Sequence, residues 1–242
     1  MHLQGTAFLA LWNDVDPARE AEYAAWHTHE HVPERVAIVG MIAGRRYQAA
    51  ERALTRYFTL YDLASLAVLD GAAYAAVVAQ PTPWSRSMRP ALTRFLRAPC
   101  ARIAGAGRAT GGSVATVRLD GARAGIDARA LQDALGEGVD RDGIVAVHLG
   151  AVAAGAPFPL ANADDPFTAA RQPHVLIVEA VDRAALAAAT PAFVTRLAGL
   201  GFASLSDDRF DLALEVTHRA AATADGGRPP PREALRARWH SA

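Results

Sequence analysis

Three of the chain's eight histidines, His27, His29 and His31, fall within five residues. Histidine is the side chain whose unperturbed pKa lies closest to neutrality, so such a cluster suits proton transfer or ligand binding. His27 and His31 are four residues apart and share one side of a helix, with Glu30 between them. The spacing therefore predicts His31 as a general acid or base, assisted by His27 or Glu30.

The same spacing is compatible with other roles for these histidines. Two imidazoles four residues apart can chelate a metal, but a zinc site needs at least a third protein ligand. No other histidine or cysteine in this half of the chain offers an obvious third ligand. We therefore expect that no metal or haem is required. A metal site, an axial haem ligand, and exposed histidines without a role stay open as alternatives.

Aromatic residues with polar tips gather in the same part of the chain. All five tyrosines and three of the four tryptophans lie within the first 84 residues. A ligand pocket combines apolar walls with a few hydrogen-bonding groups, which such side chains supply together. The alternative is an aromatic core. We predict a first-half pocket whose aromatic lining is Trp12, Tyr23, Trp26, Tyr47, Tyr57, Tyr61 and Trp84, while the equivalent space in the second half is filled by small aliphatic residues.

Local patterns predict the elements that hold these residues. Asp16 and Pro17 are typical of a helix start, and Pro33 disfavours helical geometry at the preceding residue, which predicts a break there. Glu34 and Arg35 are expected to form a surface ion pair. Strands are predicted at 6–13, 41–50 and 56–63, a helix at 65–79, and an edge strand at 95–104, because proline cannot donate to a sheet ladder.

After a glycine-rich linker at 105–112 the same order of elements recurs. Strands are predicted at 114–119, 143–152, 174–181 and 210–217, with helices at 128–135 and 183–198. Two β-α-β-β-α-β units predict an α+β fold: two ferredoxin-like repeats packed sheet to sheet as a pseudo-dimeric α+β barrel. The predicted domains are residues 1–108 with the pocket, residues 109–220, and a flexible C-terminal tail at 221–242.

Composition excludes several classes of function. The 25 basic residues are all arginine and balance 25 acidic residues, so no basic footprint for nucleic acid or an anionic membrane is present. The absence of lysine excludes Schiff-base chemistry and a P-loop. One cysteine, Cys100, permits no internal disulfide and is expected as a small buried hydrophobe, which fits a cytoplasmic protein. The expected partner is a small molecule, and a homodimer stays open.

The first half resembles the EthD-like proteins of the dimeric α+β barrel superfamily. The resemblance covers about residues 5–100. It rests on Trp26-His27-Thr-His29-Glu30-His31-Val-Pro33, on Gly40, on Arg45-Arg46-Tyr47 and on Pro81-Thr82-Pro83-Trp84. It implies a pocket between the sheet and the helices, and it favours Arg46 over Arg45 as the arginine that enters this pocket. Relatives include cofactor-free enzymes acting on small aromatic or polyketide-like compounds, and haem-binding branches.

Residues and resemblance together predict a cofactor-independent enzyme that acts on a small aromatic or enolisable compound. His31 would transfer the proton, while Tyr47, Tyr61 and Arg46 would orient a developing oxyanion. The tryptophans would form an apolar wall. A non-catalytic small-molecule binding protein with the same pocket is the alternative from a different class.

Overall fold

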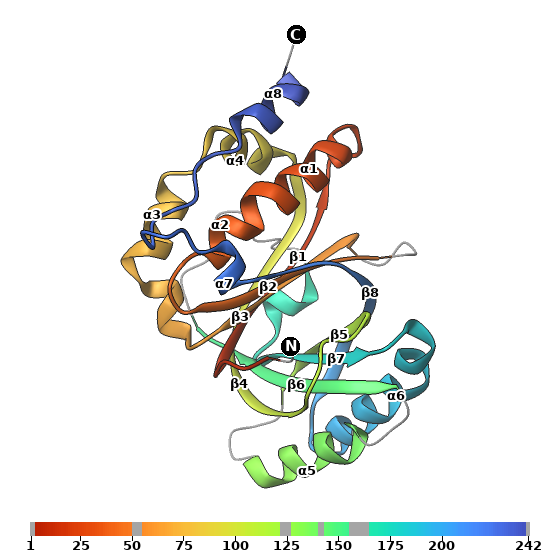
Figure 1. The fold of residues 1–242 in the computed structure, drawn as a ribbon. Coiled ribbons are helices and arrows are strands. Elements are labelled where there is room, and N and C mark those ends of the chain that lie inside the picture. The colour runs from red at the N-terminus through yellow and green to blue at the C-terminus, as the bar shows by residue number, and fades with distance from the viewer. Residues whose placement is uncertain (1–2, 50–54, 122–126, 140–142, 155–164, 241–242) are drawn as a thin grey trace.

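The computed structural model describes residues 3–49, 55–121, 127–139, 143–154 and 165–240. Within them, antiparallel strands close into one barrel in the order β1-β3-β2-β8-β5-β7-β6-β4 (Figure 1). The strands of the first half are β1 (Ala7–Val15), β2 (Met41–Gln48), β3 (Tyr57–Leu63) and β4 (Leu92–Gly107). Those of the second half are β5 (Ser113–Asp120), β6 (Ile144–Val152), β7 (Pro173–Ala180) and β8 (Ala203–Thr217).

The two halves share one strand order. Around the barrel the first half runs β4-β1-β3-β2 and the second runs β8-β5-β7-β6. The inner faces of the two halves share one core across the barrel, with Trp12 and Phe58 from the first half and Ile177 and Phe210 from the second. The halves are also hydrogen-bonded edge to edge, because β2 pairs with β8 and β4 pairs with β6. Closing the barrel pairs strand edges that would otherwise expose unpaired backbone groups.

Two long strands make this closure possible. Residues 92–101 of β4 pair with β1, and residues 100–107 pair with β6. In the same way β8 pairs first with β5 and then with β2. The strand predicted at 95–104 is therefore present but is not an edge strand, and residues 105–107 of the predicted linker belong to it. Pro99 is tolerated because it lies opposite Leu9 of β1, and pairing with β6 begins one residue later, at Cys100.

Helices cover the outside of the barrel (Figure 1). Those of the first half are α1 (Glu20–Trp26), the π-helix η2 (His27–His31), α2 (Val32–Val36), α3 (Ala72–Ala79) and α4 (Pro83–Met88), with the 3₁₀ turns η1 (Pro17–Arg19), η3 (Leu66–Asp70) and η4 (Arg89–Ala91). The second half has α5 (Ala128–Val139), η5 (Pro166–Ala169) and α6 (Arg183–Gly199), followed by α7 (His218–Ala221) and α8 (Glu233–His240). No helix in the described ranges is long and apolar enough to cross a membrane.

The barrel interior is a packed aromatic and aliphatic core. Because side chains alternate along a strand, Phe8, Ala10 and Trp12 of β1 point inward. The Trp12 ring lies 5.2 Å from the Phe58 ring, and its Nε1 donates a hydrogen bond of 3.1 Å to the Thr116 hydroxyl. Cys100 is buried in the same cluster, as expected for a small hydrophobe.

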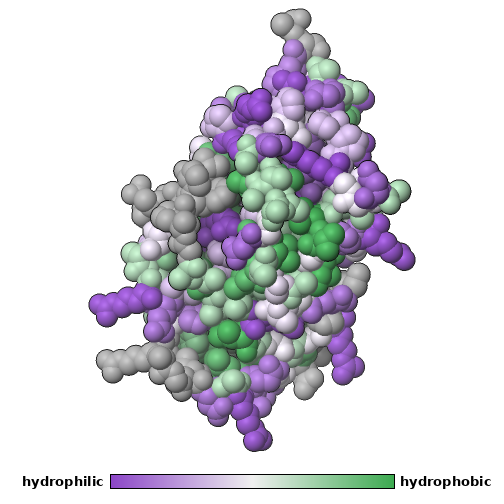
Figure 2. Space-filling view, turned by 90° about the vertical axis from the view of Figure 1, so that its left-hand side faces the viewer, coloured by the Kyte–Doolittle hydropathy of each residue, from purple (hydrophilic) through white to green (hydrophobic). Residues whose placement is uncertain are grey.

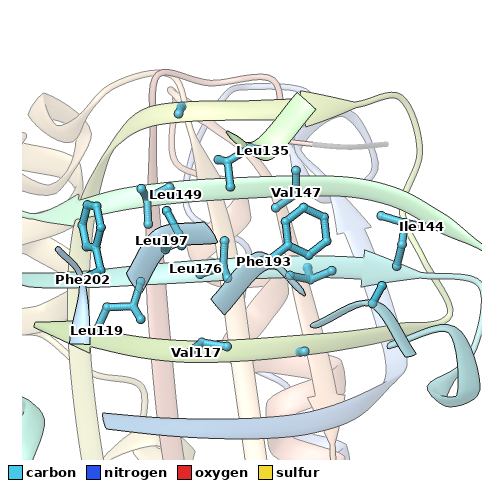
Figure 3. Close-up of a cluster of buried hydrophobic side chains, with 14 of the residues drawn as sticks. Val117, Leu119, Leu135, Ile144, Val147, Leu149, Leu176, Phe193, Leu197 and Phe202 are labelled. Atoms are coloured by element: carbon cyan, nitrogen blue, oxygen red, sulfur yellow. The ribbon is translucent and has the colours of Figure 1, made fainter. Parts of the chain in front are cut away.

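In the second half most of the space between sheet and helices is filled, apart from a pocket at the end of α5 that Gly136, Val139 and Val145 line. Leu135, Leu197 and Phe193 from α5 and α6 pack onto aliphatic residues of β5, β6 and β7 (Figure 3). The fit is tight at Gly138, where an added Cβ would lie 2.0 Å from Cε1 of Phe193. Aliphatic side chains pack to crystal-like density and leave few voids. This agrees with the expectation that mainly aliphatic residues fill this space.

The C-terminal residues, predicted as a flexible tail, lie against the helices of the first half. Three buried carboxylates contact them: Glu34 accepts from the Arg228 guanidinium, Glu30 accepts from the Arg232 backbone N–H at 2.8 Å, and Glu22 lies 3.0 Å from His240 Nε2. Leu235 of α8 packs against the cluster that holds Tyr23 and Trp26. These contacts place α8 beside α1 and α4 (Figure 1).

Candidate functional site

The histidines lie on a π-helix within one continuous helical segment. Asp16 caps its start by accepting a hydrogen bond of 2.9 Å from the Ala18 N–H. The predicted break at Val32 is absent, because this residue has helical dihedrals (φ −64°, ψ −49°). Its N–H donates to the His27 carbonyl, five residues back. A proline such as Pro33 often ends a helix at the preceding residue. Here the helix continues, and the turn before it is widened to a π-helix, a feature often found at functional sites.

The wider turn keeps four side chains on one side of the helix. In an α-helix with 3.6 residues per turn, side chains four residues apart drift steadily around the axis. The π-helix has more residues per turn and reverses this drift. As a result Tyr23, His27, His31 and Arg35 form one row that lines a pocket. The His27 ring is stacked on both neighbours, 5.1 Å from the Tyr23 ring and 5.3 Å from the His31 ring.

The pocket lies between this row and the outer face of the first-half sheet. Leu9 and Leu11 of β1 form its floor together with Thr59 and Tyr61 of β3, while α3 adds Tyr74. Its cavity volume is about 70 Å³, below the range of about 300–1,000 Å³ typical of small-molecule sites. Figure 2 shows the side of the molecule that carries α3, where apolar residues gather in the middle of the face.

Both pocket histidines are held in the neutral form. Burial lowers the pKa of His27 well below its usual value, and the positive charges of Arg46 and Arg35 lower it further. For the pKa of His31 the causes are burial, then Arg35, then His27 and Arg89. The Nδ1 atoms of both rings are buried, and neither ring makes a hydrogen bond with any described residue. The hydrogen-bonding capacity of these two Nδ1 atoms is therefore unused within the described residues.

Two hydroxyl groups on the opposite wall are also without partners. The Thr59 hydroxyl and the Tyr61 hydroxyl are buried and make no hydrogen bond within the described residues. Burial raises the pKa of Tyr61 strongly, so its hydroxyl stays protonated and can donate. Buried polar atoms are almost always satisfied, and an exception calls for an explanation. Four such atoms lie around this pocket, each with almost no solvent-accessible surface.

The remaining polar lining is positively charged. Arg35, Arg89 and Arg97 line the pocket, and no carboxylate is among its described lining residues. Glu34 and Arg35 form the expected ion pair, but it is buried instead of lying at the surface, because the two residues are only 2% and 7% exposed. Sequence reasoning missed Arg35 as a pocket residue, although its position four residues after His31 continues the row.

The structure brings together five of the predicted site residues and places the others elsewhere. The pocket is lined by Tyr23, Trp26, His27, His31 and Tyr61. Trp12 and Tyr47 belong to the barrel interior. The Trp84 indole N–H donates to Glu22 at 2.9 Å, and the Tyr57 hydroxyl donates to Glu20 at 2.6 Å, so both groups are used in holding helix α1.

Glu30 and Arg46 also lie outside the pocket lining. Glu30 is turned toward α4 and the C-terminal segment, where it accepts a hydrogen bond of 2.5 Å from the Thr82 hydroxyl. Arg46 lies on the helix side of β2 but stays behind the lining. Its guanidinium lies 5.5 Å from the Tyr23 ring centre and donates to Thr28 at 3.0 Å. Its effect on the pocket is electrostatic, through His27.

The chain resembles several known proteins in its fold. No protein-family model and no curated protein matches the chain. Among solved structures, an anthrone oxidase-like protein has 9% identity and a TM-score of 0.60, covering 93% of this chain and 98% of its own. The fold is that of the dimeric α+β barrel proteins.

Two further dimeric α+β barrel structures show the same likeness. A heme-binding protein from Thermus thermophilus has 13% identity and a TM-score of 0.53, covering 89% of this chain and 93% of its own. A candidate monooxygenase from Lactobacillus acidophilus NCFM has 10% identity and a TM-score of 0.53, covering 88% and 96%. Identities this low establish the fold alone, and the EthD-like resemblance stays a prediction.

The neutral histidines predict how stability depends on pH. Because the pKa of each is lowered in the folded state, the unfolded chain binds more protons below about pH 6.5. The free energy of unfolding should be highest above that pH. As the pH is lowered below about 6.5, the free energy of unfolding should fall by about 1.4 kcal/mol per pH unit for each histidine, until the pH reaches the folded-state pKa. Urea unfolding at a series of pH values between about 7.5 and 5 measures this slope. A His31→Gln variant should show a shallower slope, and equal slopes would contradict buried neutral imidazoles.

Proposed function

We propose that this protein is a cofactor-independent enzyme that removes a proton from a small aromatic, enolisable compound bound in the first-half pocket. One observation carries the proposal: His27 and His31 are neutral, lie side by side in the pocket and have no hydrogen bond to any described residue. A general base must be unprotonated at the working pH and within reach of the proton that it takes. The pair meets the first condition throughout the neutral range.

His31 is the base in this proposal, and His27 positions it. His27 is 5% exposed and is enclosed by the Tyr23 and His31 rings, whereas His31 is partly exposed in the pocket. A ring nitrogen of His31 takes the proton, and the electron pair of the broken C–H bond stays on the substrate as an enolate. The imidazolium is disfavoured by burial and by Arg35. The negative charge of the enolate formed beside it offsets the positive charge of the imidazolium. When the step reverses, the imidazolium returns the proton to the substrate carbon.

The hydroxyls of Tyr61 and Thr59 are placed to stabilise the enolate oxygen. They are the buried donors without partners on the sheet side of the pocket, among the residues described. A donor aimed at the developing charge in a water-poor site contributes more to the rate than the same bond in water. Tyr61 keeps the role that the sequence assigned to it, and Thr59 replaces Tyr47 and Arg46 in that role. Leu9, Leu11 and Trp26 supply the apolar wall for an aromatic ring.

Neither a metal nor haem enters the proposed chemistry. In the described part of the chain, no group of three histidine, cysteine, aspartate or glutamate side chains is arranged to hold a metal ion. Haem iron accepts a single axial imidazole, which His31 can offer, and one structural neighbour is a heme-binding protein. A Soret band on addition of haemin, lost in His31→Ala, would favour a haem protein over the proposed enzyme.

Proton exchange in anthrone tests the proposal directly. The anthrone oxidase-like neighbour suggests this tricyclic ketone as a probe, because its methylene group enolises. Chelator-treated protein in D₂O, kept free of oxygen, should accelerate loss of the methylene proton signal above the rate in buffer. Binding without acceleration would favour the non-catalytic carrier. No binding of anthrone or of other aromatic ketones would remove the pocket proposal itself.

We also propose that the barrel consists of two ferredoxin-like repeats, residues 1–108 and 109–220. Their identical strand order supports this division. In this interpretation the first repeat keeps the pocket and the second has filled it. Phe193 occupies the space between helix and sheet in the second half, where the first half leaves room for a ligand.

A further inference from the structure

Two arginines of the pocket, Arg35 and Arg89, have too few acidic partners among the described residues. Arg35 is 7% exposed, and its Nη1 donates to Glu34 Oε2 at 3.0 Å. The other oxygen of this carboxylate, Oε1, accepts from Arg228 of the C-terminal segment, with a distance of 2.7 Å to Nε. Both oxygens of Glu34 are thus engaged, and one negative charge serves two guanidinium groups. Arg35 keeps donors that Glu34 does not satisfy.

Arg89 adds a second positive charge on the same side of the pocket. It is partly buried in η4, and its Nη2 donates to the Val78 carbonyl at 3.0 Å. It forms no ion pair with any described residue. Burial lowers the pKa of Arg89, the nearby charge of Arg35 lowers it further, and the Glu34 carboxylate offsets part of this decrease. Two like charges face one pocket that contains no carboxylate among its described lining residues.

Such a pair is costly unless something negative joins it. Charges taken out of water need a partner in good geometry. A guanidinium group offers parallel N–H donors that match the two oxygens of a carboxylate. The neutral imidazoles cannot supply the missing negative charge, and the hydroxyl of Tyr61 stays protonated because burial raises its pKa.

We propose that Arg35 and Arg89 form a carboxylate-binding subsite, so that the ligand of this pocket is an aromatic carboxylate. The inference deepens the proposed function and rests on it, because it names the class of compound that the same pocket takes. The carboxylate lies at the Arg35 end of the row, and the aromatic body extends along His31 and His27 toward Tyr23. The leucines of β1 form the opposite wall.

A matched pair of probes tests the subsite. 2-Naphthoate and 2-naphthamide have nearly the same shape, but only the first carries a charge at neutral pH. Titration calorimetry should show that the wild-type protein binds 2-naphthoate at least about tenfold more tightly, the range expected for a charge-assisted hydrogen bond. Arg89→Gln should remove most of this preference while leaving the affinity for 2-naphthamide nearly unchanged. Arg35→Gln should do the same, provided that circular dichroism shows it folded.

Arg86→Gln is the matched control. Arg86 is exposed, lies three residues before Arg89, and is outside the pocket lining. Removing its charge changes the net charge equally but should keep the preference for 2-naphthoate. Equal affinity of the wild type for both probes would overturn the subsite and leave the proposed function standing. Binding of neither probe would overturn both. Loss of the preference in Arg86→Gln as large as in Arg89→Gln would show a general field effect and would also overturn the subsite.

Discussion

His31→Ala should slow enzyme-catalysed proton exchange by about 10²- to 10⁴-fold, the range for loss of a general base. Stability should change little, because a pocket side chain that faces open space leaves no new enclosed cavity. The substitution also removes an imidazole whose Nδ1 is buried without a hydrogen bond to any described residue. Exchange of the anthrone methylene protons, followed by NMR, measures the rate, and urea unfolding at mildly alkaline pH measures the stability.

His29→Ala is the control for this variant. His29 lies on the same π-helix but is exposed and outside the pocket lining, so its removal should leave the exchange rate unchanged. His148→Ala tests the other half of the barrel. His148 lies on β6 and is fully buried, and the folded fraction of this variant should keep its rate. If His148→Ala abolished exchange while His31→Ala did not, the active pocket would lie in the other half.

Arg45→Met should destabilise the barrel by about 3–5 kcal/mol, the cost of leaving a buried charge without its partner. Arg45 is 1% exposed and donates from Nε to Glu215 at 2.7 Å, and its Nη1 lies 3.6 Å from Glu179. Glu179 is fully buried, and burial raises its pKa although Arg45 opposes this rise. Without the guanidinium, the Glu179 carboxylate must stay charged in the core or bind a proton.

The double variant Arg45→Met, Glu179→Gln separates the two causes of instability. If the uncompensated charge dominates, the double variant should recover much of the lost stability. The amide that replaces the carboxylate keeps an oxygen for the Gly111 N–H, which donates to Glu179 at 3.1 Å in the wild type. If lost packing dominates, the second substitution should add to the damage. Arg129→Met is the surface control, because its ion pair with Asp133 is exposed. It should change the unfolding free energy by less than about 0.5 kcal/mol.

The sequence determined the elements because their signals are local. Strands at Met41–Gln48 and Tyr57–Leu63 follow from alternation of side chains, and the helix start at Asp16 follows from a cap that depends on residues two apart. The uneven distribution of tyrosine and tryptophan indicated the half in which the pocket beside His27 and His31 lies. In the second half, aliphatic composition alone indicated dense packing.

Predictions from local sequence were wrong for the features that depend on distant parts of the chain. Nothing near Pro99 shows that β4 continues to Gly107 and pairs with β6, because that pairing depends on a strand far along the chain. Pro33 indicates a break, yet the tertiary packing of α2 on β2 favours a widened turn that keeps the helix continuous. A proline excludes some hydrogen bonds, but it does not choose among the ways of avoiding them.

The identity of the pocket lining was decided only by the tertiary structure. The four-residue spacing alone determined that His27 and His31 share one side of a helix. In the structure that side faces the sheet. It could not determine which neighbours join them. Glu30 turns to Thr82 and the C-terminal segment, while Arg35, expected at the surface, is drawn inward with Glu34. Polar side chains are placed by the partners that satisfy their charge and hydrogen bonds, and those partners come from residues far away along the chain.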